Sequence, residues 1–180
     1  MNQGQFSGLV TEYEYSHTVK GVKIYQGKMK IERQSRATDT ILFMHWNPDI
    51  EAGKFYSIQG ELRTFMQEVY PKKKIYIKVK EIKELDEPSY VNELTFSGVL
   101  IRKNELRTTP FGRTIIEFMV ADQTNYANLI AWGAIAFKVK DLIDNCKVEV
   151  SGKLQSREYV KDNSFYTVNE ISCFRVDEVV

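Results

Sequence analysis

The feature that most constrains the fold of this chain is an internal repeat with a spacing of about ninety residues. Three short segments return in the same order, at spacings of 90, 92 and 89 residues. Residues 6–10 return as 96–100, residues 54–62 as 146–154, and residues 80–82 as 169–171. Such self-similarity indicates two copies of one structural unit. Residues 85–90 contain an acidic pair and Pro88, which are typical of a short linker. We therefore predict an N-terminal domain at residues 1–87 and a C-terminal domain at residues 88–180.

Within each copy the hydrophobic pattern has a period of two, which is typical of β-strands. Five segments of the second copy carry it: residues 96–101, 115–120, 127–132, 147–154 and 165–176. Glycines interrupt the pattern at matching places, at Gly8 and Gly60 in the first copy and at Gly98 and Gly152 in the second. A glycine inside a strand indicates a bulge or a tight barrel corner, so the strands are predicted to bend there.

One helical pattern interrupts the second copy at residues 134–144, where apolar residues recur on a single face. The matching interval of the first copy, residues 47–51, is too short for more than one turn. Five strands with a helix between the third and the fourth follow the plan of the OB-fold. We predict an all-β chain with one short helix, folded as two tandem five-stranded Greek-key OB barrels, the first of them divergent. Other small barrels remain an open alternative.

The composition excludes several classes of protein. Hydrophobic residues make up 43% and charged residues 27%, as in an ordinary globular chain. There is no apolar run of about 18 residues and no signal-like N-terminus, so we expect a cytoplasmic protein without a membrane span. The two histidines and two cysteines lack metal-ligand spacing, so we expect free thiols, no metal and no cofactor. No catalytic motif is present, so we do not expect an enzyme.

Residues 126–132 form a strand whose two faces differ in character. Ala127, Leu129 and Ala131 point to one side and suit a protein core, whereas Tyr126 and Trp132 point to the other. Aromatic rings on an open sheet face are suited to stacking on unpaired bases, at roughly 1 to 3 kcal/mol per base. The same rings could instead be covered in a subunit interface or in the core, because aromatic residues are also enriched in protein contacts.

Positive charge is concentrated in the first copy, although the formal net charge of the chain is only +1. Residues 54–83 hold eight lysines or arginines against three glutamates. Aromatic residues interleave with these cations, as a groove for a single strand requires. The candidate rings of the first copy are Phe43, Trp46, Phe65 and Tyr70, and the corresponding hairpin carries Lys72, Lys73 and Lys74. The three lysines could equally form a solvated turn.

The second copy resembles the bacterial and phage single-stranded DNA-binding protein family over nearly its whole length. Residues 98–100 resemble the start of the family's first strand, residues 105–112 its first loop, and residues 131–133 the end of its third strand. Residues 148–159 are similar to the family's pattern V-x-V-x-G-x-L-x-(T/S)-R-x-(aromatic). In the first copy residues 31–34 and 60–64 resemble the same family more weakly.

The resemblance implies sequence-tolerant binding of single-stranded DNA, protecting it in replication, repair or recombination, in a phage or another mobile element or its host. It implies base stacking by Tyr126, Trp132 and Tyr159, and adds Phe111 of the first loop to the candidate rings. The phosphate contacts expected in the second copy are Arg102, Lys103, Arg107, Arg113, Lys153, Arg157 and Lys161; those in the first are Arg33, Arg63, Lys72, Lys73 and Lys74.

By analogy with the tetrameric members of the family, a homodimer of this chain would supply four barrels. The sequence stops at residues 177–180 without the family's long acidic tail, so we expect no partner recruitment through such a tail. Two other functions remain open: a protein-interaction or dimerisation module of a replication or conjugation assembly, and an RNA-binding protein, since stacking alone does not separate DNA from RNA. Whether the first copy binds nucleic acid is also open.

Overall fold

The structure is a computed structural model, and it describes residues 1–69 and 73–180. Within that part of the chain it contains eleven β-strands and one α-helix. The first half comprises β1 (Asn2–Val19), β2 (Val22–Glu32), β3 (Thr38–His45), β4 (Phe55–Met66) and β5 (Lys73–Glu84). The second half comprises β6 (Val91–Lys103), β7 (Arg107–Thr108), β8 (Thr114–Ala121), β9 (Tyr126–Trp132), α1 (Ala134–Asp141), β10 (Lys147–Lys161) and β11 (Ser164–Glu178).

The prediction of a mostly β chain with one short helix is confirmed. The five predicted strands of the second copy are present as β6, β8, β9, β10 and β11, and each extends beyond its predicted limits. The helix is shorter than the predicted 134–144, because Leu142 already has an extended backbone. It packs through Ala136 and Val139, both buried, beside β8, β9 and β11.

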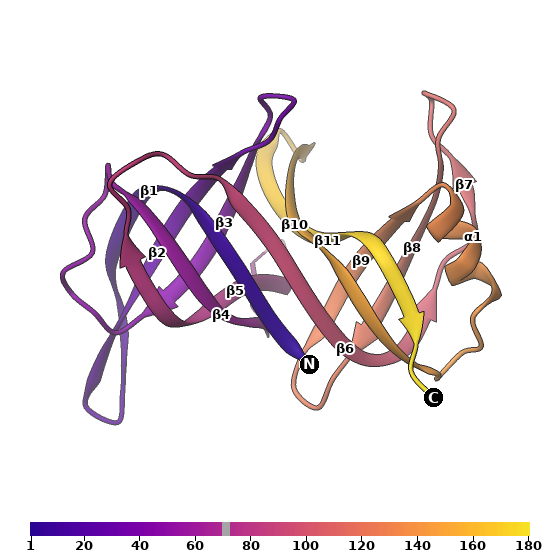
Figure 1. Cartoon of the computed structure of the whole chain (residues 1–180), viewed down its shortest axis with the longest axis horizontal. Helices are drawn as coiled ribbons and strands as arrows, with labels where there is room; N and C mark the ends of the chain where they lie inside the picture. The colour runs from indigo at the N-terminus through magenta and orange to yellow at the C-terminus, as the bar shows by residue number, and fades with distance from the viewer. Residues whose placement is uncertain (70–72) are drawn as a thin grey trace.

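All strands belong to one continuous sheet, in the order β2-β3-β5-β4-β1-β6-β10-β11-β9-β8-β7. In the first half the pairings also return from β2 to β1, and in the second half from β8 to β6. Each circuit has one short parallel pairing, β3 with β5 and β9 with β11. The two halves lie side by side and are joined by the antiparallel pairing of β1 with β6 (Figure 1). The sheet is thus continuous where the sequence suggested two separate barrels.

The β1–β6 pairing relates the halves by an approximate twofold axis. Gly4 pairs with Leu94, and Leu94 is also the residue of the second copy that corresponds to Gly4 at the repeat spacing of 90 residues. Two asparagines at the same spacing make the same contacts on either side. The Asn2 amide donates to the Leu62 carbonyl (2.9 Å) and accepts from the Leu62 N–H (2.8 Å). Asn92 makes the corresponding pair with Leu154, at 3.0 and 2.8 Å.

The four repeated glycines are places of close approach between neighbouring strands. A Cβ added at Gly60 would lie 2.3 Å from the Lys78 carbonyl oxygen, and one at Gly152 would lie 2.4 Å from that of Ser172. Gly8 and Gly98 face neighbouring carbonyl oxygens in the same way, at 2.3 and 2.4 Å. The strand register shifts directly before Gly60 and Gly152. The predicted bends at Gly60 and Gly152 are therefore confirmed, and only glycine fits these positions.

One part of the sequence repeat was aligned wrongly. Leu62 pairs with Ile77 and its equivalent Leu154 pairs with Ile171, so Ile171 corresponds to Ile77. The sequence comparison had matched Ile171 with Ile82. A strand with alternating apolar residues resembles itself at several registers, and such a pattern alone does not choose among them.

No helix in the described residues is long and apolar enough to cross a membrane.

Candidate nucleic-acid interface

The inward face of β9 is as the alternation predicted, whereas the opposite face is only partly open, because Ile130 on that face is buried. Ala127, Leu129 and Ala131 are fully or almost fully buried. Tyr126, on the opposite face, is 53% exposed, and Trp132 is half-buried. β9 therefore presents one aromatic ring at each end of its outward face.

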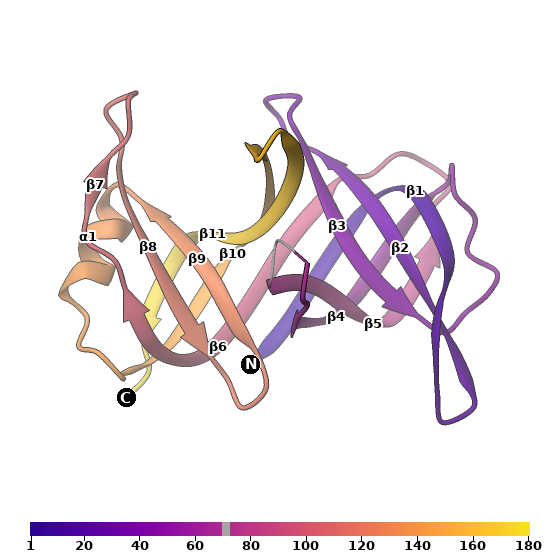
Figure 2. The ribbon, with the colours of Figure 1, turned by 180° about the vertical axis from the view of Figure 1, so that it is seen from behind.

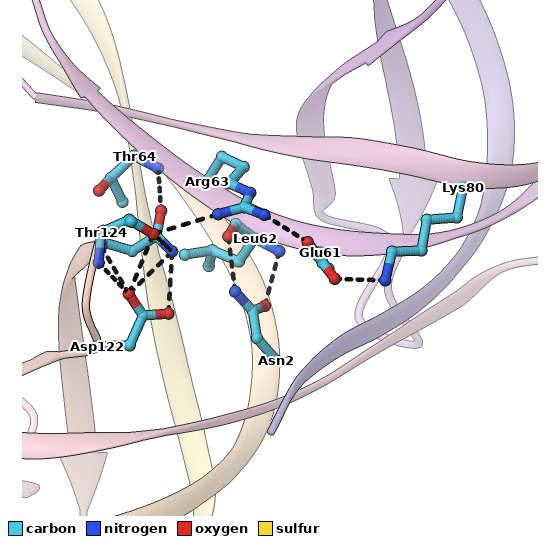
Figure 3. A network of polar contacts seen from close by, with 9 residues as sticks. Asn2, Glu61, Leu62, Arg63, Thr64, Lys80, Asp122 and Thr124 are labelled. Carbon is cyan, nitrogen blue, oxygen red and sulfur yellow. Dashed lines mark hydrogen bonds and ion pairs between the residues drawn. The ribbon is translucent and has the colours of Figure 1, made fainter.

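Tyr126 is held in position by the first half of the chain. Its backbone N–H donates to the Thr64 hydroxyl at 3.0 Å, and the Thr64 N–H donates to the side-chain oxygen of Asn125, also at 3.0 Å. The amide group of Asn125 in turn donates to both carboxylate oxygens of Asp122, at 3.1 and 3.0 Å. Figure 3 shows the part of this network that links Thr64 of β4 to Asp122 in the β8–β9 turn. The Lys73 ammonium of the first half lies 6.0 Å from the centre of the Tyr126 ring.

Trp132 lies in a cleft of about 800 Å³ between the two halves. The Arg113 guanidinium lies 5.9 Å from its ring centre, within the range of a cation–π contact. Lys153, predicted as a phosphate contact, and Tyr90 also line this cleft. A ring with cations beside it is an arrangement that can hold a base and its phosphate together.

The other two rings predicted in the second half are less closely associated with β9. Tyr159 is half-buried in the β10–β11 hairpin, and its ring lies 5.9 Å from that of Tyr166. Phe111 is 93% exposed in the turn between β7 and β8. The stacking roles of both remain predictions.

A smaller hollow of about 180 Å³ lies on the outward side of β8, β9 and β11. Arg102 and Arg157 line it together with Asn128 and two glutamates, and the phosphate contacts of both arginines remain predictions. Arg157 lies 3.6 Å from the buried carboxylate of Glu170. Burial raises the pKa of Glu170, while Arg157 acts in the opposite direction. The hollow thus combines cations with carboxylates.

The structure corrects the assignment of Lys103. Its ammonium donates to the carbonyls of Lys140 (2.8 Å) and Leu142 and lies 3.7 Å from the Asp144 carboxylate. Lys103 therefore stabilises the C-terminal end of α1, where a cation offsets the partial negative charge of the helix.

Arg107 is exposed and pairs with Glu117 at 3.2 Å, and Lys161 is exposed in the β10–β11 hairpin.

Phe43, predicted to stack on bases, is fully buried. Its ring fills the space beside Gly27, where an added Cβ would lie 2.3 Å from it, and it stacks at 5.9 Å on Tyr13. The prediction for Phe43 is wrong, because the residue lies on the inward face of β3.

Trp46 is 61% exposed, with its ring 5.0 Å from that of His45. Phe65 is half-buried against Tyr76, and Tyr70 and Lys72 lie outside the described residues.

Arg33 has an ionic partner inside the protein, and its phosphate contact remains a prediction. Its guanidinium binds both carboxylate oxygens of the buried Asp39, with Nε at 2.9 Å from Oδ2, and is engaged in holding this charge. Arg63 pairs with Glu61 at 2.6 Å and donates to the Thr124 hydroxyl at 3.2 Å. Both arginines thus take part in contacts inside the protein.

The contacts of Tyr126 have an equivalent in the first half. Ser156, the counterpart of Thr64, donates its N–H to Asp39 at 3.0 Å and accepts from the Thr40 N–H at 2.9 Å. Asp39 thus corresponds to Asn125 and Thr40 to Tyr126. Six residues on, by the same spacing, Trp46 corresponds to Trp132. The first half has the tryptophan but lacks the tyrosine.

Sequence reasoning missed the outward residues of β2, Lys28 and Lys30, and also Phe165 of the β10–β11 hairpin. All three line a groove of about 630 Å³ between the halves. The two lysines alternate with the buried Met29 and Ile31, so the period-two pattern could have identified them. No group of three or more His, Cys, Asp or Glu in the described residues could hold a metal ion.

No family model and no curated protein sequence matches this chain. Among solved structures, the fold is similar to that of the wild-type single-stranded DNA binding protein from Thermus aquaticus, with a TM-score of 0.77 and 18% sequence identity. The similarity covers 100% of this chain and 93% of that chain. A variant of the same protein, with a deletion and one substitution, gives a TM-score of 0.75 and 19% identity over 100% of this chain and 95% of that one. At this identity the likeness shows the fold.

Proposed function

We propose that this protein binds single-stranded DNA with little sequence preference and without catalysing a reaction. The observation that carries this proposal is the outward face of β9, where Tyr126 is exposed and Trp132 lies beside Arg113 in a cleft. The fold adds support, since it is similar to that of a protein described as binding single-stranded DNA.

In the proposed mechanism, Tyr126 and Trp132 each stack on a base while cations around them neutralise phosphates. Every base has a flat face, so stacking favours unpaired strands of any sequence. Lys73 beside Tyr126, and Arg113 and Lys153 around Trp132, supply the positive charge. Binding should therefore weaken as salt rises, because each neutralised phosphate releases counterions.

We further propose that each half is one OB-type unit, with a boundary near residues 87–88. The two circuits of strand pairing and the equivalent contacts of Asn2 and Asn92 support this division. A homodimer would then bring together four such units. Protection of exposed strands in replication, repair or recombination, in a phage or another mobile element, is the proposed role.

Titration of a fluorescently labelled oligo-dT with the protein, at two salt concentrations, tests the proposal. We expect sub-micromolar binding that weakens with salt, together with quenching of the tryptophan fluorescence. No binding at low salt would contradict the proposal and favour a protein-interaction module. A parallel titration with oligo-U distinguishes RNA, and tighter binding of oligo-U than of oligo-dT would make RNA the preferred ligand.

A further inference from the structure

The groove of about 630 Å³ lies on the part of the first half that corresponds to the proposed stacking face of the second. Its floor is the outward side of β2 and β3, with Lys28, Lys30, Thr40 and Leu42. One wall is the start of β5, and the other is the β10–β11 hairpin of the second half. Figures 1 and 2 show, from opposite sides, this hairpin curving toward the first half. The groove is therefore built by both halves together.

The charge of this groove is strongly positive. Four lysines line it, namely Lys28, Lys30, Lys73 and Lys74, against a single glutamate, Glu12. Glu12 pairs with Lys28 at 3.0 Å, so this carboxylate is already balanced. Among the described residues, neither Lys30 nor Lys73 nor Lys74 takes part in an ion pair. Three cations without a counter-charge thus face one space.

Lys73 is placed against other positive charge. Burial and the nearby Arg102 of the second half both lower the pKa of Lys73. Two cations brought together without an anion between them repel each other, and a phosphate placed there would relieve this repulsion. The position of Lys73 also connects the groove with Tyr126, since its ammonium lies 6.0 Å from that ring.

The aromatic side chain of the groove comes from the other half of the chain. Thr40 occupies the place that Tyr126 has in the second half, so the floor itself offers no ring there. Phe165, at the start of β11, lines the groove and is 81% exposed. An exposed phenylalanine beside unpaired lysines can stack on a base whose phosphates the lysines hold.

We propose that this groove is a second binding site for single-stranded nucleic acid, continuous with the β9 face by way of Lys73. Lys30 and Lys74 contact phosphates in it, and Phe165 stacks on one base. The site holds mainly the backbone, whereas the β9 face holds mainly bases. This inference rests on the proposed function and extends it, because a long strand would occupy both halves of one chain.

The double variant Lys30→Ala with Lys74→Ala tests the second site, since neither residue contacts Tyr126 or Trp132. With an oligo-dT of about 30 nucleotides, enough for two OB-type faces, we expect the slope of log affinity against log salt to become shallower by roughly 1.4, which is two phosphates at about 0.7 each. The number of nucleotides covered per chain, measured with poly-dT, should fall. With an oligo-dT of about 8 nucleotides, which one face can hold, we expect less than a twofold change.

The control is Lys23→Ala with Lys83→Ala, which removes the same charge from exposed positions outside the groove. This control should keep the wild-type salt slope and site size. Phe165→Ala should weaken binding of the long oligonucleotide several-fold and leave the short one unchanged. If the wild type binds oligo-dT but the groove variant behaves like the control, the second site is wrong and the proposed function stands. If the wild type does not bind at all, the proposed function itself fails.

Discussion

The two halves of the molecule share their internal contacts but differ on their outward faces. A Cβ added at Gly60 or at Gly152 would lie at nearly the same distance from the carbonyl oxygen of the neighbouring strand. The outward residues nearby are different. Phe65 lies three residues after Leu62, and Arg157 lies three residues after the equivalent Leu154, so Phe65 corresponds to Arg157. By the same pairing of strands, Tyr76 corresponds to Glu170. Phe65 and Tyr76 make an edge-to-face ring contact at 5.7 Å, whereas Arg157 and Glu170 form an ion pair at 3.6 Å.

This difference indicates which positions determine the fold and which are free to change. Only glycine fits where two strands approach closely, because any other residue would bring a Cβ. An asparagine amide can bond both the N–H and the carbonyl of a residue that has no backbone partner there, and no other side chain matches that geometry. Outward positions only need to be compatible with a strand and with solvent. The first half therefore carries lysines such as Lys30 where the second has Ala121, and the second carries Tyr126 where the first has Thr40.

Substitution of the corner glycines should have the largest effect, and a similar one in both halves. Gly152→Val would place a Cβ against the Ser172 carbonyl, and Gly60→Val would do the same at Lys78. Overpacking of this kind costs about 3 kcal/mol when backbone must move. Urea unfolding measures the loss. A much smaller cost at Gly60 than at Gly152 would show that the halves do not share this corner. Gly53→Ala is a control for loss of a glycine in open space, although its φ of 91° adds some strain.

Removal of Asp39 should cost more stability than removal of its counterpart Asn125. The Asp39 carboxylate accepts from the Arg33 guanidinium and the Ser156 N–H, and a hydrogen bond to a charged group contributes about 1.5 to 3 kcal/mol. We expect Asp39→Ala to lower the free energy of unfolding by roughly 2 to 3 kcal/mol and Asn125→Ala by roughly 1 to 2 kcal/mol. Equal losses would mean that the charge at Asp39 adds nothing to the contact between halves.

The two tryptophans should differ in binding. Trp132→Ala should weaken oligo-dT binding by roughly 1 to 3 kcal/mol without unfolding the chain. Trp46→Ala should cost under about 1 kcal/mol, since no cation among the described residues makes a cation–π contact with its ring as Arg113 does with that of Trp132. Fluorescence anisotropy gives the affinities, and urea unfolding reports stability. Should Trp132→Ala unfold the protein, the ring is part of the core and the assignment of the face is reversed.

Glu170 should produce a small effect that depends on pH. Because burial raises its pKa, the folded protein holds this proton more tightly than the unfolded chain does. That contribution to stability is present below the unfolded-state pKa and is lost as pH rises through the raised pKa. Glu170→Gln cannot ionise, so we expect it to exceed the wild type in stability by under about 1 kcal/mol at neutral pH, with the difference disappearing in acid. Glu158→Gln, an exposed carboxylate in the same hairpin, is the control. A difference that persists in acid would contradict this.

Local patterns in the sequence were sufficient for part of this picture. Alternation along β9 placed Ala127 and Leu129 inside and Tyr126 outside, because side chains of a strand change face at every residue. The same rule assigns Phe43 and Trp46, three residues apart, to opposite faces, and applying it to β3 would have excluded Phe43 from the stacking rings. Counting alternate residues was thus more informative than residue type.

Contacts between the halves were beyond the reach of such patterns. The Thr64 hydroxyl is 62 residues from the Tyr126 N–H that it binds, and nothing in either segment indicates the other. The groove beside Lys30 is completed by Phe165 from a hairpin of the other half, so neither copy read alone contains the site. The ion pair of Arg33 with Asp39 was also not predicted. The two residues are only six positions apart, on either side of a turn, but the sequence does not show that Asp39 is buried.

The position of β1 has a consequence for synthesis of the chain. Residues 4–7 of β1 pair with β4 on one edge and with β6 on the other, and β6 is translated after β4. Until residue 96 has left the ribosome, one edge of β1 is open, and an open strand edge accepts any matching strand. A neighbouring nascent chain offers the same β6, so we expect swapped dimers after refolding at high protein concentration. Size-exclusion chromatography after refolding at low and high concentration measures them, and an identical profile at both would show that β6 of the same chain always arrives first.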